Sequence, residues 1–84
     1  MIAVHYFASV RESLGCDLEK LELPADVNTV AGLIDVLVNK HGKHWQEVLG
    51  ERSVMIAVNY EIADRSASLA DGDEVAFFPP VTGG

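Results

Sequence analysis

Alternation of large apolar side chains with smaller or more polar ones, the pattern of a β-strand, recurs along the chain. At its start, Ile2, Val4 and Tyr6 fall on one side of a predicted strand. His5 and Phe7 then fall on the other side. The strands predicted in this way are residues 2–9, 18–23, 54–58 and 74–78, with a short further strand from Ile62.

Between the second and third of these strands, the period changes to that of an amphipathic helix. Asn28 or Thr29 can cap its first turn, and Gly42 suits a left-handed cap at its C-terminal end. We predict that a short second helix follows at residues 43–49, and that a helical turn at residues 10–14 precedes the second strand. The apolar stripe of the main helix consists of Val30, Leu33, Ile34, Leu37 and Val38.

This order of elements predicts a single small α+β domain spanning residues 1–84. One main helix is enough to cover one face of a mixed sheet of four or five strands. The pattern fits the β-grasp roll of ubiquitin-like domains, in which the first and last strands run parallel at the centre of the sheet. Pro79 and Pro80 end the last strand, because proline has no amide proton to donate.

A helix that covers one face of the sheet leaves the other face largely open. By the same alternation, Phe7 and Phe78 fall on that open face, and Ile62 is a candidate third member just after the Asn59–Glu61 turn. An exposed apolar patch of this kind is typical of a protein interface. The alternative is that the short helix or a loop folds over the two phenylalanines.

Composition narrows the classes of partner. The net charge of −7 would repel phosphate backbones, and the six Lys and Arg residues are scattered, so we expect no nucleic-acid binding and favour a basic partner surface. No apolar stretch is long enough to span a bilayer, and residues 1–4 lack the basic start of a secretory signal. We therefore expect a cytoplasmic protein without membrane attachment.

Residues that could carry chemistry inside the domain are sparse. Cys16 is a single thiol, and His5 has no nucleophile at a recognisable motif spacing. His41 and His44 lack further ligands, so we expect solvated surface histidines and no metal site. No phosphate-binding loop occurs, and we expect no bound cofactor.

The remaining chemical candidate is the C-terminal pair Gly83-Gly84. A segment without side chains beyond Thr82 is narrow enough to be threaded into a channel of another protein. We therefore expect residues 79–84 to form a flexible tail that is presented by its terminal carboxylate.

Three segments resemble the family of molybdopterin synthase small subunits, MoaD. They are Ile2–Glu12, Ala57-Val58-Asn59 and, most specifically, Leu69–Gly84 with its Phe-Phe-Pro-Pro approach to the glycines. The thiamin sulfur carrier ThiS shares the fold and the terminal glycines, but is typically shorter and lacks the region of the second helix. Residues 43–52 depart from the family pattern.

The resemblance implies a sulfur carrier that is not itself the catalyst. A MoeB-like activating enzyme uses ATP to adenylate Gly84, and sulfur then converts it to a thiocarboxylate. Val81, Thr82 and Gly83 would be threaded into a MoaE-like large subunit, which holds the active site and the cyclic pyranopterin monophosphate. The implied assembly is a heterotetramer of two small and two large subunits, with Phe7, Ile62 and Phe78 at positions that contact both partners.

Two other functions use the same terminus. A ubiquitin-like modifier would join Gly84 to a lysine through an isopeptide bond, and a sulfur carrier could serve another pathway such as thiamin synthesis. A third alternative is a plain binding module in which the terminal glycines have no role.

Overall fold

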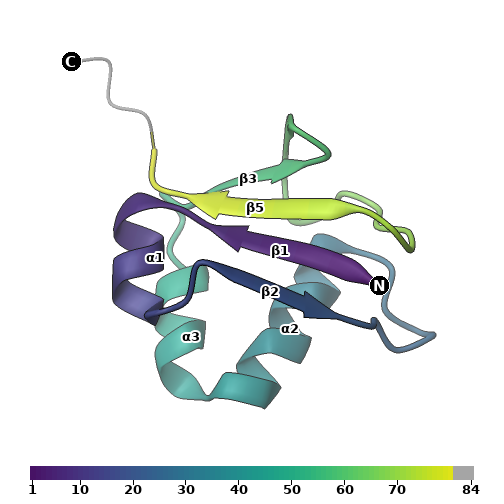
Figure 1. The fold of residues 1–84 in the computed structure, drawn as a ribbon, viewed down its shortest axis with the longest axis horizontal. Coiled ribbons are helices and arrows are strands. Elements are labelled where there is room, and N and C mark those ends of the chain that lie inside the picture. Colours follow the sequence, from purple (N-terminus) through teal and green to yellow (C-terminus); the bar gives the residue numbers. More distant parts are fainter. Residues whose placement is uncertain (81–84) are drawn as a thin grey trace.

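The computed structural model describes residues 1–80, and residues 81–84 lie outside the described part. The described chain forms a five-stranded sheet with three helices against it (Figure 1). The strands are β1 (Ile2–Tyr6), β2 (Leu18–Leu21), β3 (Met55–Val58), β4 (Glu61–Ala63) and β5 (Glu74–Phe78). The helices are α1 (Ala8–Leu14), α2 (Val30–His41) and α3 (Lys43–Leu49).

The sheet has the strand order β2-β1-β5-β3-β4, with β1 and β5 parallel and the other neighbours antiparallel. The arrowheads of β1 and β5 point the same way in Figure 1. Val4 pairs with Val75 and Tyr6 with Phe77 in this parallel pair. The predicted β-grasp arrangement, with the first and last strands parallel inside a mixed sheet, is therefore confirmed.

All three helices pack on one face of the sheet, as the one-sided apolar stripes require (Figure 1). Helix α2 begins at Thr29, whose Oγ1 accepts a hydrogen bond from the Gly32 amide at 3.2 Å. The core between sheet and helices includes Ile2, Val4, Tyr6, Val30, Leu33, Leu37, Trp45, Leu49, Ile56, Val75 and Phe77.

Two local predictions need correction. Gly42 ends α2, and its amide donates to the Val38 carbonyl at 2.7 Å, but its ψ of −169° places it outside the left-handed helical region. Gly42 is also the N-cap of α3, so its backbone has to redirect the chain from one helix into the next, which a left-handed helical cap would not do. The boundary between the first strand and the first helix also differs: a strand at residues 2–9 and a turn at residues 10–14 were predicted, but β1 ends at Tyr6 and α1 is a full element, Ala8–Leu14.

Candidate functional site

The open face of the sheet carries its large apolar side chains at one end. The Phe7 amide donates to the Phe77 carbonyl at 3.0 Å, so Phe7 continues the parallel pairing and lies beside Phe78. Met55 pairs with Phe78 from the other side. Phe7 is 46% exposed because it ends β1 and caps α1 with extended backbone angles, away from the packed helices.

Ile62 extends this face to the edge strand. It pairs with Ala57, which in turn pairs with Ala76 on β5. Ile62 is 66% exposed, and Phe78 is half-buried. The three residues thus project from one face, as predicted, and neither the short helix nor a described loop covers Phe7 or Ile62.

The small side chains of Ala57 and Ala76 leave a hollow of about 290 Å³ in the middle of the open face. Its walls are aromatic and its lining is almost entirely apolar, apart from one carboxylate and one imidazole. The residues that line it are His5, Phe7, Ala57, Tyr60, Glu74, Val75 and Ala76.

Glu74 supplies that carboxylate, and it is held in place from two sides. His5 Nε2 lies 3.1 Å from Oε1, and the Tyr60 hydroxyl donates to Oε2 at 3.0 Å. The hydrogen bonds from His5 and then from Tyr60 lower the pKa of Glu74. The bond to Glu74 in turn raises the pKa of the Tyr60 phenol. Glu74 is therefore ionised, and Tyr60 is neutral, near neutral pH.

This cluster was not predicted from the sequence. Alternation places His5 on the open face, but only the strand register shows that it pairs with Ala76 and that Glu74, two residues before Ala76 on β5, lies on the same face. Tyr60 comes from the β3–β4 turn, where Asn59 and Tyr60 have φ of 51° and 70°. Positive φ is uncommon for a residue as large as tyrosine, and it is visible only in the structure.

The last strand leads directly to the predicted tail. β5 ends at Phe78, as predicted, with Pro79 half-buried and Pro80 exposed. Both prolines border a second hollow of about 370 Å³ beside α1 and α3, which is lined by Ser9, Ser13 and His44 among others. Val81, Thr82, Gly83 and Gly84 lie outside the described residues, so their roles stay predictions.

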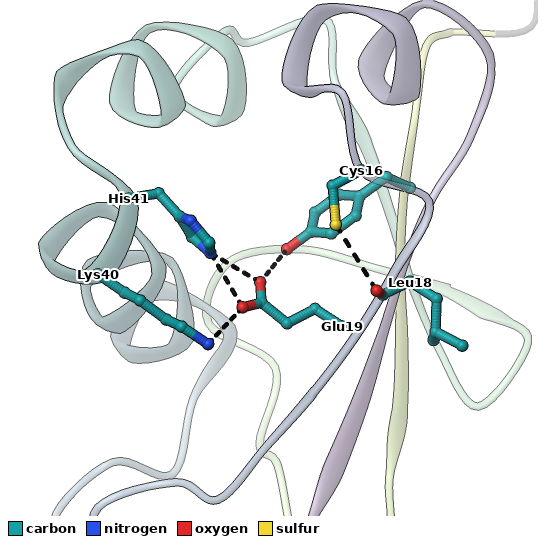
Figure 2. A network of polar contacts seen from close by, with 6 residues as sticks. Cys16, Leu18, Glu19, Lys40 and His41 are labelled. Atoms are coloured by element: carbon teal, nitrogen blue, oxygen red, sulfur yellow. Dashed lines mark hydrogen bonds and ion pairs between the residues drawn. The ribbon is translucent and has the colours of Figure 1, made fainter.

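A polar network joins β2 to the end of α2 on the helix side of the sheet (Figure 2). Lys40 Nζ donates to Glu19 Oε2 at 2.6 Å, and His41 Nε2 lies 2.9 and 3.0 Å from the two oxygens. Burial alone would raise the pKa of Glu19, but the hydrogen bonds from Lys40 and His41 outweigh it and lower the pKa.

His41 is an exposed residue, as predicted, but its ring is held by contacts that were not predicted. Besides its bond to Glu19, its ring stacks on Trp45 with centroids 3.7 Å apart. The Cys16 thiol donates to the Leu18 carbonyl at 3.6 Å (Figure 2), and Cys16 also packs against the core. Within residues 1–80, no group of three or more His, Cys, Asp or Glu residues is arranged to hold a metal ion.

Known proteins of similar sequence show the family of this chain. The sequence profile of the ThiS family matches residues 4–84. The chain belongs to the ThiS family. Within that family, the molybdopterin synthase sulfur carrier subunit of Escherichia coli (strain K12) is 43% identical over 84 residues, covering 100% of both chains. The predicted relationship to these sulfur carriers is confirmed.

Solved structures give the same fold. The crystal structure of small archaeal modifier protein 1 from Haloferax volcanii superposes with a TM-score of 0.77 at 31% identity, covering 99% of this chain and 98% of that one. The complex of subunits 1 and 2 of the molybdopterin-converting factor from Helicobacter pylori 26695 contains a chain that superposes with a TM-score of 0.67 at 26% identity, covering 99% and 97%. In residues 1–80, none of the helices has the length and apolarity needed to cross a bilayer.

Proposed function

We propose that this protein is the sulfur-carrying small subunit of a molybdopterin synthase and that the Gly84 carboxylate is the group that carries the sulfur. The observation that carries the proposal is the 43% identity to the Escherichia coli sulfur carrier subunit, which extends over the full length of both chains. The described structure supports it with an open apolar face at the root of the C-terminal segment.

The chemistry needs an activating enzyme because a carboxylate is a poor electrophile. Attack of a Gly84 oxygen on the α-phosphorus of ATP forms an acyl adenylate and releases pyrophosphate. A sulfur nucleophile then forms the bond to the Gly84 carbonyl carbon, and AMP leaves with the bonding electron pair. The resulting thiocarboxylate is the nucleophile that donates sulfur to the cyclic pyranopterin monophosphate.

The carrier supplies the sulfur, and the large subunit supplies the catalytic groups. The Helicobacter pylori complex contains two converting-factor subunits, and a MoaE-like large subunit is the corresponding partner here, in a heterotetramer of two small and two large chains. Phe7, Ile62 and Phe78 would contact this subunit and a MoeB-like activating enzyme, one at a time. Val81, Thr82 and Gly83 would enter the partner's channel, and the reaction would take place in the cytoplasm.

Intact-mass spectrometry tests the proposal directly. The full chain, incubated with its activating enzyme, ATP and sulfide, should gain the mass difference between one sulfur and one oxygen atom. Deletion of Gly84, or Gly84→Ala, should leave the unfolding free energy unchanged and abolish adenylation. A deletion variant that acquires sulfur as fully as the wild type would refute the assignment of Gly84.

A second candidate is a protein modifier, because the structure of small archaeal modifier protein 1 superposes at 31% identity. The same experiment in a cell extract separates the two functions. A carrier yields the sulfur-containing mass, whereas a modifier yields larger species in which Gly84 is joined to a lysine of another protein. Sulfur transfer to a thiamin precursor instead of the pyranopterin would assign the carrier to that pathway.

A further inference from the structure

The hollow on the open face combines a mostly apolar lining with one carboxylate. It is lined by the small side chains of Ala57 and Ala76 and by the aromatic residues Phe7 and Tyr60, so it can accept an apolar stem. One carboxylate, Glu74, also lines it. An occupant that satisfies both features is apolar along its length and cationic at its tip.

Glu74 has capacity for a further donor. A carboxylate offers about four acceptor positions, and only His5 and Tyr60 donate to this one among residues 1–80. No Lys or Arg side chain of the described residues lies within ion-pair distance of it. Lys20 is the nearest cation in the sheet register, because Ala3 pairs with Lys20 on one side and with Glu74 on the other. Its charge contributes to the lowered pKa of Glu74, but the two side chains form no ion pair.

The aromatic walls favour a flat cation. The rings of His5 and Phe7 stand parallel, 6.1 Å apart between centroids and 8° between planes. A guanidinium group stacks on such faces and bonds to carboxylates in its own plane, whereas an ammonium group is a compact, strongly hydrated point charge. The hollow therefore suits arginine better than lysine.

Tyr60 occupies a costly position for a large side chain. It sits in the second of two positive-φ positions in a two-residue hairpin turn, with φ of 70°, where glycine is the residue of least strain. The side chain is 88% exposed, so packing into the core does not account for it. The contacts that involve Tyr60 are instead the hydrogen bond from its hydroxyl to Glu74 and its position in the lining of the hollow.

We propose that this hollow is an arginine-binding subsite, which receives one arginine side chain from a protein partner of the carrier. The aliphatic stem lies on Ala57 and Ala76, and the guanidinium group bonds to Glu74 between the aromatic walls. Charge complementarity supports this occupant, because the carrier has a net charge of −7 and presents this carboxylate inside an apolar face. That the partner is the large subunit or the activating enzyme rests on the proposed function; the subsite itself does not.

A titration followed by amide NMR tests the subsite without any partner protein. The probe is N-acetylarginine amide, and the control ligand is the citrulline analogue, which has the same shape without the charge. The arginine probe should shift the resonances of His5, Ala57 and Ala76, and the citrulline probe should bind at least about tenfold more weakly. Equal binding of the two probes, or shifts spread over other surfaces, would overturn the proposal.

Two matched variants assign the effect to one carboxylate. Glu74→Gln should weaken the arginine probe about tenfold, whereas Glu61→Gln, which removes the same charge from the neighbouring edge strand outside the hollow, should have no effect. The same pair of variants is then measured against the cognate large subunit and activating enzyme. Equal affinities of the two variants for the probe contradict the subsite, while failure of the wild type to acquire sulfur contradicts only the proposed function.

Discussion

Val75 and Ala76 are neighbours on β5, but they belong to two very different surfaces. Val75 points into the helix-covered face, where Val4 and Phe77 are also fully buried. Ala76 points to the open face, together with Phe7 at 46% exposure and Ile62 at 66%. Because the two faces share the same strands, a change of one position along a strand moves a substitution from the packed core to the open face. We therefore expect substitutions on the covered face to lower stability, and substitutions on the open face to change recognition with little effect on stability.

The largest effect is expected at the covered face. Phe77→Ala removes a fully buried ring and should lower the free energy of unfolding by about 3–5 kcal/mol, because the surrounding core cannot fill the cavity. Urea unfolding, monitored by circular dichroism, measures this change in the free energy of unfolding. Phe7→Ala, the same chemical change on the open face, should cost less than about 1 kcal/mol. Equal losses for the two variants would remove the distinction between the faces.

The Glu19 network should contribute a smaller, pH-dependent part of the stability. Glu19→Gln removes charge-assisted hydrogen bonds from Lys40 and His41, and should cost about 1–2 kcal/mol near pH 7. Since the folded-state pKa of Glu19 is lowered, this contribution is fully present above the unfolded pKa of about 4.3 and is lost as pH falls through the lower folded value.

Urea titrations of wild type and Glu19→Gln at several pH values check this prediction. The difference between the two proteins should shrink steadily below about pH 4. A difference that stays constant down to acid pH would mean that packing, and not the ionised carboxylate, accounts for the loss.

On the open face, recognition should change with little effect on stability. Ile62→Asp should alter the free energy of unfolding by no more than about 0.5 kcal/mol, because Ile62 is mostly exposed. The affinity of the Ile62→Asp variant for the large subunit should fall at least about tenfold, because the new charge would be desolvated against an apolar surface of the partner. Calorimetry measures the affinity, and Glu61→Gln on the same strand serves as the control. Wild-type affinity in Ile62→Asp would place the interface elsewhere.

The smallest effect is expected at Tyr60. Tyr60→Phe keeps the ring and removes the hydroxyl that donates to Glu74, so the pKa of Glu74 should rise toward its usual range. Carboxyl-carbon NMR during an acid titration reports this pKa. An unchanged value would show that the Tyr60 hydroxyl does not contribute to the lowered pKa, which would then rest on His5 and the charge of Lys20.

Periodicity was enough to predict the fold and the two faces. The alternation in residues 2–9 and 74–78 placed Phe7 and Phe78 opposite the core, and the stripe from Val30 placed the main helix correctly. Contacts that depend on strand register, or on the approach of a helix end to an edge strand, could not be predicted. His5 with Glu74 and His41 with Glu19 are such contacts, since each pair joins residues far apart in the sequence.

The parallel pairing of β1 with β5 also determines when Phe7 and Phe78 come together on the open face. Phe7 and Phe78 come from opposite ends of the described chain and become neighbours only after the central strands have paired, a step that requires closure of a very long loop. An unfolded or truncated chain can contain both side chains but cannot present them together. An activating enzyme that contacts both residues would therefore spend ATP only on carriers that have completed folding.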